Sequence, residues 1–295
     1  MENIKSAFSL IELSVVILIV GILVIGITKG SRIIRSSRLS SARSLSRSSP
    51  VTSTPNLVAW YDSTAEGSLI SGSYNNTTSD TSNISDGSLI KTWQDVNPLS
   101  TDKRNATVVS SDSNRPSYLA NAINGLPAIS FDGASDYFSL PDGTVPYGNS
   151  NYTIFFIAST KALAARGLLG SGTYGSTNLT NAFRYDGSFG YYNYWWDVDL
   201  SGTSNAITVN KPHLLVFLYN GSMRHCFING NTTPNASVAS SNRSSTAINN
   251  TIGVTNSLTE YMFGNIGEII IFDRALTTTE RTNIEQYLIK KWSIK

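Results

Sequence analysis

The chain contains one cysteine, two histidines and few charged residues, and each scarcity excludes a class of protein. A single cysteine cannot form an intramolecular disulfide or a CxxC metal site, and two histidines leave little material for a histidine-based metal or triad site. Charged residues make up 14% of the 295 residues and the net charge is +2, which excludes a globally basic nucleic-acid-binding protein. Aromatic residues make up 10%, which argues against a disordered chain.

A long apolar run stands near the N-terminal end. Residues 8–27 contain a single charged side chain, that of Glu12. A helix of this length spans about 30 Å, the thickness of the hydrocarbon core of a bilayer, so we expect a membrane-spanning helix. The run is longer than the apolar part of a secretory signal and lacks its small-residue cleavage site, which disfavours a conventional cleaved signal.

Glu12 separates two interpretations of this helix. An ionised carboxylate that faces lipid costs several kcal/mol unless it finds a partner, and a plain anchor has no use for one. In a self-assembling helix the carboxylate pairs with the positive amino terminus of a neighbouring subunit, which requires cleavage just before Phe8. The alternative is an ordinary single-span anchor with an incidental glutamate.

The segment around this glutamate reads Lys5-Ser6-Ala7-Phe8-Ser9-Leu10-Ile11-Glu12-Leu13. It resembles the processing site of type IV prepilins and pseudopilins. The resemblance implies that residues 1–7 are a leader, that a prepilin peptidase cuts between Ala7 and Phe8, and that Phe8 is then N-methylated. It also implies that Glu12 sets the register with other pilin subunits. The sequence departs from the family at Ala7, where glycine is usual, and it lacks the helix-kinking proline.

A serine- and arginine-rich segment follows the apolar run. We interpret it as a solvated helical stalk or flexible tether, with contact to anionic lipid head groups or DNA phosphates as the alternative. Its basic residues are Arg32, Arg35, Arg38, Arg43 and Arg47. The positive-inside rule would place this flank in the cytoplasm; we nevertheless expect it outside, because long domains translocate largely regardless of flank charge.

The expected organisation has four parts. Residues 1–7 form the leader, residues 8–47 the apolar helix and basic stalk, residues 48–55 a linker, and residues 56–295 a β domain. Pro50 and Pro55 mark the linker, because proline cannot continue a helix. In the β domain short strand-like runs alternate with turn signals, which predicts an antiparallel β-sandwich or jelly roll. The predicted strands are 57–61, 89–93, 128–131, 152–159, 183–185, 214–219, 225–228 and 268–272.

One helix is indicated at the C-terminal end. Thr277 and Glu280 form a capping-box pattern, which typically begins a helix. Ile284, Leu288 and Trp292 follow at a spacing of four residues and predict one apolar stripe that packs on the sandwich.

Several short motifs, each occurring once, are distributed along the β domain. In chain order they are Trp60-Tyr61-Asp62, Trp93-Gln94-Asp95, Arg104-Asn105-Ala106-Thr107, Arg115-Pro116-Ser117-Tyr118, Asn124-Gly125-Leu126-Pro127-Ala128, Phe131-Asp132-Gly133, Asp136-Tyr137 and Gly267-Glu268-Ile269-Ile270-Ile271-Phe272-Asp273-Arg274-Ala275-Leu276. Together they resemble bacterial laminin G-like domains of the concanavalin A-like lectin/glucanase group. The resemblance implies a two-sheet antiparallel sandwich whose first and last strands are neighbours. This fold carries lectins, glycosidases, adhesive modules and structural modules, so it does not by itself define a ligand.

The acidic residues do not form a convincing catalytic pair. Glycoside hydrolysis needs two carboxylates across a cleft, and the alternating E-x-D-x-x-E pattern of the glucanases is absent. Glu268 and Asp273 are five residues apart and point to opposite faces of a strand. We therefore expect no enzymatic activity. Calcium is the one cofactor suggested, with Asp132, Asp136 and Asp273 as candidate ligands; turn-forming aspartates are the alternative.

The most distinctive local feature is a cluster of aromatic residues. On a strand, Tyr192, Tyr194 and Trp196 share one face, and Tyr191 and Trp195 share the other. One set belongs to the core, and the other offers flat rings on which the C–H faces of sugars stack. All five residues are candidates for ligand binding, with packing of the whole cluster into the core as the alternative.

These features predict a minor type IV pilin or pseudopilin. We expect a single-pass protein of a bacterial inner membrane whose extracytoplasmic sandwich, on a pilus or at the cell surface, contacts glycans or surface proteins. The first alternative is a plainly anchored binding module with no filament role. The others are a glycan hydrolase and a DNA-uptake pilin that uses its arginine-rich stalk.

Overall fold

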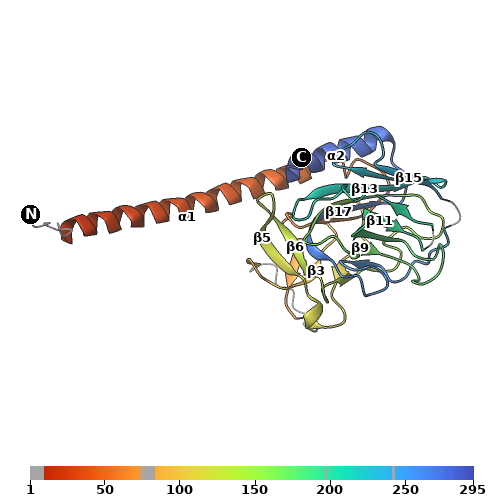
Figure 1. Cartoon of the computed structure of the whole chain (residues 1–295), viewed down its shortest axis with the longest axis horizontal. Helices are drawn as coiled ribbons and strands as arrows, with labels where there is room; N and C mark the ends of the chain where they lie inside the picture. The colour runs from red at the N-terminus through yellow and green to blue at the C-terminus, as the bar shows by residue number, and fades with distance from the viewer. Residues whose placement is uncertain (1–9, 74, 76–83, 197, 241–242) are drawn as a thin grey trace, which may run out of the picture.

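The computed structural model describes residues 10–73, 75, 84–196, 198–240 and 243–295, and for residues 25–29 and 31–32 it describes the backbone alone. The chain forms three layers, in which two antiparallel sheets face each other and helices cover the outer face of one sheet (Figure 1). The helices are α1 (Leu10–Arg47) and α2 (Thr278–Trp292), with a 3-10 turn at Asp112–Asn114. The predicted β-sandwich with an N-terminal and a C-terminal helix is confirmed.

Sheet A is built around β17 (Phe263–Phe272). Along one edge β17 pairs with β8, and along the other it pairs with β6 over its first half and with β1 over its second half. The first and last strands of the domain are therefore neighbours, as predicted. The remaining strands, in spatial order, are β15 (Ala236–Ala239), β14 (Met223–Ile228), β13 (His213–Tyr219), β8 (Tyr152–Thr160), then β17, β6 (Leu126–Asp132) and β5 (Ser117–Ile123), with β1 (Leu57–Asp62) beside β17.

Sheet B contains shorter strands and forms the other side of the sandwich. In spatial order they are β12 (Leu200–Ser201), β11 (Gly190–Tyr194), β10 (Ala182–Asp186), β9 (Arg166–Gly170), β16 (Thr251–Ile252), β7 (Phe138–Ser139), β4 (Ala106–Thr107), β3 (Ile90–Trp93) and β2 (Leu69–Ser71). Each of the eight strands predicted from the sequence corresponds to a strand of sheet A or sheet B.

Alternate side chains of sheet A serve two separate cores. All nine residues of β8 are buried, because both faces of this strand are covered. Ile154 and Phe156 belong to the core between the two sheets, whereas Phe155 and Ile157 belong to a second core beneath the helices. The helices therefore lie on sheet A, on the opposite side of the sandwich from the outer face of sheet B.

Helix α2 begins and packs as the sequence predicts. The side chain of Thr277 accepts a hydrogen bond from the backbone of Glu280, and the Glu280 carboxylate accepts one from the backbone of Thr277. Ile284, Leu288 and Trp292 are fully buried in the second core. The stripe predicted at four-residue spacing thus holds the helix on sheet A.

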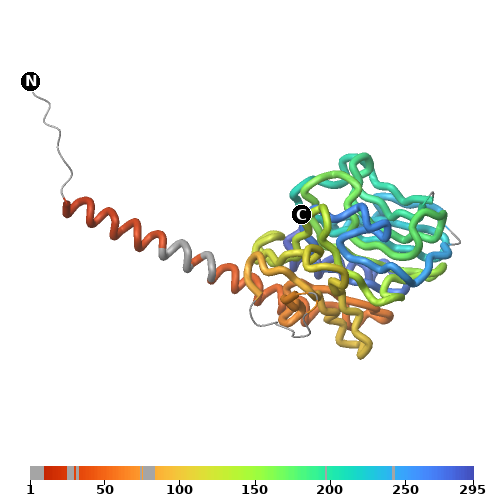
Figure 2. The backbone as a smooth tube through the Cα atoms, turned by 90° about the horizontal axis from the view of Figure 1, so that it is seen from below, coloured from red at the N-terminus to blue at the C-terminus, as the bar shows by residue number. Residues whose placement is uncertain are grey.

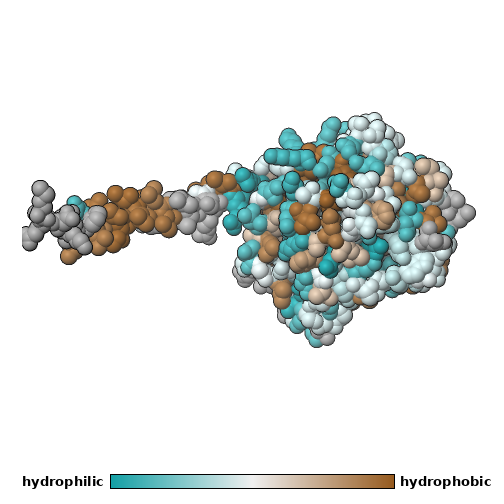
Figure 3. Space-filling model, viewed as in Figure 1, coloured by the Kyte–Doolittle hydropathy of each residue, from teal (hydrophilic) through white to brown (hydrophobic). Residues whose placement is uncertain are grey.

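Helix α1 extends away from the sandwich at its N-terminal end (Figures 1 and 2). Every side chain from Leu10 to Val24 is exposed, and this stretch is the brown part of the helix in Figure 3. Among the described residues, no helix combines the length and the apolar character that crossing a membrane requires. Ala7 and Phe8, the predicted processing site, lie outside the described residues; Glu12 lies in the first turn of α1.

The prediction of a solvated stalk is wrong for the last turns of α1. Ile34 and Arg38 are exposed, as expected, but Ala42 is 2% exposed and Ser46 is 9% exposed. Val51, in the predicted linker, is fully buried. The end of the helix is therefore packed into the second core, and it does not act as a flexible tether.

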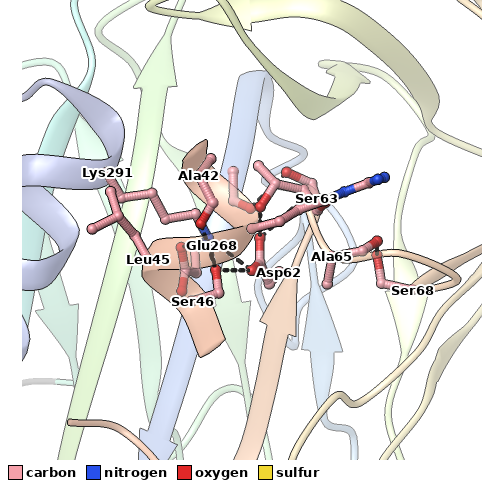
Figure 4. A network of polar contacts seen from close by, with 12 residues as sticks. Ala42, Leu45, Ser46, Asp62, Ser63, Ala65, Ser68, Glu268 and Lys291 are labelled. Carbon is pink, nitrogen blue, oxygen red and sulfur yellow. Dashed lines mark hydrogen bonds and ion pairs between the residues drawn. The ribbon is translucent and has the colours of Figure 1, made fainter. Parts of the chain in front are cut away.

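A buried group of charges fixes this junction (Figure 4). The ammonium of Lys291 lies 2.7 Å from Oδ2 of Asp62 and 2.7 Å from Oε2 of Glu268, and all three side chains are fully buried. It also donates a hydrogen bond of 2.9 Å to Oγ of Ser46 on α1. This charged latch, formed by Ser46, Asp62, Glu268 and Lys291, joins α1 and α2 to strands β1 and β17.

Candidate functional site

In the described part of the chain both helices lie on sheet A, which leaves the outer face of sheet B without a helix. Side chains alternate across this sheet. Tyr185 and Tyr191 are paired on neighbouring strands and fully buried in the core, whereas Arg184 and Tyr192, the adjacent pair, point outwards. Tyr194, two residues further along β11, points outwards as well and is half-buried.

Five rings form what we call the aromatic row on this outer face: Phe189, Tyr192, Tyr194, Trp196 and Tyr174. The ring centroids of Phe189 and Tyr192 are 5.3 Å apart, those of Tyr194 and Trp196 are 5.6 Å apart, and Tyr174 approaches Trp196 to 4.6 Å, edge to face. Phe189 and Tyr174, at the two ends, are exposed. The row therefore offers flat apolar surface on an otherwise polar face.

The guanidinium of Arg184 connects the two halves of the row. Its central carbon lies 5.3 Å from the ring centroid of Tyr192 and 4.9 Å from that of Tyr194, and an ion pair with Glu260 holds it there. Burial and the nearby carboxylate of Asp199 raise the pKa of Tyr194 to about 12, so its hydroxyl stays protonated and able to donate a hydrogen bond. Rings, a guanidinium and a phenol thus occur together.

The backbone changes direction at the end of β11 and keeps Trp196 on the outer face. The side chain of Asp199 accepts a hydrogen bond of 2.7 Å from the backbone of Trp195. Trp196 then has φ 59°, in the left-handed region that bulky residues seldom occupy. This local strain, held by the surrounding turn, places Trp195 in the core and Trp196 outside.

Two of the predicted ligand-binding residues are removed from the surface. Tyr191 and Trp195 are fully buried between the sheets, where no ligand reaches them. Two buried guanidinium groups pack over the Trp195 ring, that of Arg224 at 3.8 Å and that of Arg243 at 5.5 Å from its centroid. The prediction that one set of the aromatic cluster belongs to the core is correct for Tyr191 and Trp195. The other set, Tyr192, Tyr194 and Trp196, lies half-buried on the outer face.

Residues 253–262 cross the outer face of sheet B over β9, and two glycines allow this approach. A Cβ at Gly167 would overlap the backbone of Thr255, and one at Gly170 would overlap the backbone nitrogen of Asn256. The backbone N–H of Gly167 donates a hydrogen bond of 2.8 Å to the carbonyl of Glu260. The absence of side chains at these two positions of β9 therefore lets the loop place Glu260 beside the aromatic row.

The same loop borders a polar hollow on its other side. This hollow has a volume of about 470 Å³ and lies over β7 and β16. Asn256 is 8% exposed, and its Oδ1 is a buried acceptor with no hydrogen-bond partner among the described residues. The other lining residues include Tyr137, Ser139, Asp142, Asn249, Asn250 and Thr251.

The three candidate calcium ligands do not converge. Asp132 and Asp136 lie beside the first residue of β17, whereas Asp273 follows its last residue. Among the described residues there is no group of three or more histidine, cysteine, aspartate or glutamate side chains that could hold a metal ion. These three candidate residues therefore do not form one calcium site, because opposite ends of a ten-residue strand separate them.

Asp132 and Asp136 instead organise their own turn, as the alternative interpretation predicted. Burial opposes ionisation of Asp132, but backbone N–H groups of Ser135, Ala134 and Asp136 bond its carboxylate and bring its pKa below the usual range. Burial and the charge of Asp132 raise the pKa of Asp136 to about 7. Asp132 is therefore ionised near neutral pH, whereas Asp136 is about half protonated.

Two facing antiparallel sheets with adjacent first and last strands define the jelly-roll class of sandwiches. The family model described as the concanavalin A-like lectin/glucanases superfamily matches residues 132–280, which are just over half of the chain. The chain belongs to this superfamily. Among curated proteins, none matches the sequence.

Solved structures share the fold at low sequence identity. A GH54 α-L-arabinofuranosidase soaked with a cyclic sulfate inhibitor has a TM-score of 0.60 and 11% identity, over 85% of this chain and 65% of that one. An arabinofuranosidase complexed with arabinofuranosyl-α-1,2-xylobiose has a TM-score of 0.57 and 10% identity, over 80% and 63%. Trypanosoma rangeli sialidase has a TM-score of 0.50 and 15% identity, over 82% and 34%. The chain thus spans less than two thirds of each, and the likeness shows the fold alone.

The sequence did not single out the groups that complete the site. Tyr174 lies in a separate loop, and Arg184 and Glu260 come from elements that are 76 residues apart. No local pattern links these positions, because sheet pairing brings them together. A strand that contains two glycines, as β9 does at Gly167 and Gly170, often marks a close approach of another backbone segment. This signal could have predicted the crossing loop.

Proposed function

We propose that this protein is a minor pilin- or pseudopilin-like subunit whose β-sandwich binds carbohydrate through the outer face of sheet B. The aromatic row is the observation that carries the binding half of the proposal. Flat rings beside an arginine and a hydrogen-bonding phenol suit sugars, which present both apolar C–H faces and hydroxyl groups. The polar hollow, lined by asparagine, serine and threonine side chains, adds a second group of contacts on the same face.

Removing rings from the aromatic row is expected to weaken glycan binding without unfolding the domain. Trp196→Ala and Tyr194→Ala should each lower the affinity for a bound glycan by at least about tenfold, because aromatic anchors dominate such contacts. A glycan array with the full chain identifies the ligand, and calorimetry measures the loss. Tyr147→Ala is the matched control, since Tyr147 is 51% exposed and lies outside the row. Equal binding by all variants would remove the row from the site.

The assembly half of the proposal depends on the N-terminal segment. The resemblance at Ala7, Phe8 and Glu12 supports it, as does a helix that leaves the sandwich with exposed apolar side chains on every side. We place this helix in a bacterial inner membrane, with other pilin-type subunits and a prepilin peptidase as partners and the sandwich outside. The competing function is a plainly anchored binding module.

Mass spectrometry of the protein from its native host separates these two functions. We expect a chain that begins with N-methylated Phe8, since cleavage supplies the amine that pairs with Glu12 of a neighbour. Glu12→Ala should then abolish co-assembly while leaving membrane insertion unchanged, and Glu66→Ala, a similar loss of charge on the exposed surface of the sandwich, should change neither. A mature chain that still begins with Met1 would leave only the anchored binding module.

A further inference from the structure

A second concave surface lies on the helix side of the sandwich. One hollow of about 470 Å³ lies between α1, α2 and the turn between β5 and β6. A second, of about 570 Å³, continues from it to the start of β13, and both are lined by Asn124, Ser293 and Lys295. We call the two together the basic groove. The end of α2 and the C-terminus, whose residues line this groove, lie on the side of the sandwich from which α1 leaves (Figure 1).

The charged side chains that line this groove are all basic. Arg38 and Lys290 border its first hollow, Lys211 borders its second, and Lys295 borders both; all four side chains are exposed. Lys291 also contributes to the wall, but its ammonium is bound within the charged latch. None of the described residues that line the groove is acidic. Anionic groups are therefore favoured there.

Hydrogen bonds hold the groove in one shape. The amide of Asn124 donates to the carbonyl oxygens of Trp292, at 2.8 Å, and Ser293, at 3.1 Å. The amide of Asn229 donates to the carbonyl oxygen of Lys295 at 2.9 Å. These bonds tie the end of α2 to two turns of sheet A, so a ligand would meet a preformed surface.

The walls also present apolar and hydroxyl groups between the cations. Carboxylated sugars need this combination, because their rings have apolar C–H faces while their hydroxyl and carboxylate groups form hydrogen bonds. The apolar and hydroxyl side chains of the groove are Ser41, Ala42, Leu45, Leu126, Ala206, Thr208 and Pro212.

A lipid surface fits this groove less well. Arg38 lies eleven residues beyond Ile27, the end of the apolar run, which is about 16 Å along a helix. This distance is about twice the Debye length of roughly 8 Å at physiological salt, so head groups at the end of the run would be largely screened from the groove. A flat bilayer would also leave the concave floor unfilled.

We propose that the basic groove binds a carboxylate-bearing polysaccharide. Arg38, Lys290, Lys295 and Lys211 contact its carboxylates, and the apolar residues between them contact its ring faces. The site is separate from the aromatic row, since it lies beside the helices on sheet A. The protein would therefore hold an acidic glycan on one side of the sandwich and a second ligand on the other.

Calorimetry with the full chain in a neutral detergent tests this site. Hexagalacturonate is the acidic probe and maltohexaose, of equal length, is the neutral one. We expect hexagalacturonate to bind at least tenfold more tightly than maltohexaose and to lose affinity as salt is raised. Equal affinity for the two oligosaccharides, or no binding of the acidic one, would overturn the proposal. Tyr147→Ala, which lies outside both the basic groove and the aromatic row, should leave hexagalacturonate binding unchanged.

Charge variants locate the binding. Lys290→Gln with Lys295→Gln should lower hexagalacturonate affinity about a hundredfold, and Arg38→Gln alone about tenfold, because each removes a charge-assisted hydrogen bond. Lys103→Gln with Lys161→Gln removes the same charge elsewhere and should have little effect. Duplex DNA or phosphatidylglycerol vesicles that bind more tightly than hexagalacturonate, and depend on the same residues, would overturn the assignment in favour of that partner. Unchanged melting temperatures verify that the variants fold.

Discussion

Replacing Lys291 with methionine is expected to lower the free energy of unfolding by about 3–5 kcal/mol, because it removes the cation from a buried ion pair. Methionine fills much of the space of the lysine stem but leaves Asp62 and Glu268 facing each other without a positive charge. Burial and the charge of Asp62 already raise the pKa of Glu268 despite the opposing attraction of Lys291. Without Lys291, Glu268 must take up a proton or the junction must open.

The measurement is chemical denaturation of the full chain in a mild detergent, followed by tryptophan fluorescence. Trp60 and Trp292 each donate a hydrogen bond to Glu268, at 2.8 Å and 2.7 Å, so their environment reports on the latch. Lys290→Met is the matched control: this neighbouring lysine is exposed, and its loss should change stability by no more than about 0.5 kcal/mol. Equal losses in both variants would contradict a specific role for Lys291.

A rescue variant separates charge from packing. Adding Glu268→Gln to Lys291→Met removes one of the two unpaired carboxylate charges while keeping an acceptor for the tryptophan and tyrosine donors. Stability should be partly regained, because the main cost is the buried uncompensated carboxylate. Failure to regain any stability would assign the loss to the cavity around the lysine stem instead.

Replacing Gly170 with valine is expected to destabilise the domain by about 3 kcal/mol, because overpacking forces the surrounding structure to move. The atoms in the way belong to the backbone at Thr255 and Asn256, which cannot rotate aside as the end of a side chain can. The crossing loop would lift from sheet B and carry Glu260 away from Arg184. Glycan binding by the aromatic row should therefore fall as well, by at least about tenfold.

Gly21→Ala provides the control, because nothing lies within 4 Å of a Cβ at that position and alanine favours the helix. Its stability and glycan affinity should match those of the unchanged chain. Thermal denaturation and calorimetry with the same glycan measure both effects. A Gly170→Val variant that loses stability but binds the glycan normally would show that the loop does not support the aromatic row.

Much of the fold could be predicted from the sequence, because its signals are local. Strand runs such as 152–159 and 214–219 are rich in β-branched and aromatic residues, and the Thr277–Glu280 capping box sets the start of α2. The strands that escaped prediction include β4, β7, β12 and β16, which have two residues each. Such short strands have no periodicity of their own and exist only because longer neighbours pair with them.

Only part of the candidate site could be predicted from the sequence. Alternation along β11 correctly separated Tyr191 from Tyr192, since opposite faces follow from strand geometry alone. Tyr174 and Arg184 complete the aromatic row through tertiary contacts. The sequence around each of them contains no pattern that predicts these contacts. The three aspartates failed as a calcium site for a related reason: their order along the chain says nothing about which end of a strand they occupy.

The stalk shows the limit of reasoning from composition. Serine and arginine predicted a solvated tether, yet Ser46 bonds with two buried charges, Asp62 on β1 and Lys291 on α2. A serine has the same local signature in either setting. The lysine that it meets stands 245 residues later, and no rule of helix spacing links the two.

The charged latch determines how mechanical tension would travel through the molecule. Glu268 belongs to β17, which is paired along both edges, so a pull along α1 is delivered to the middle of sheet A. Strands on both sides of β17 would have to shear together before the helix could peel away. The sandwich would accordingly move with α1 as one rigid body. The outer face of sheet B would stay turned away from the helix during this movement.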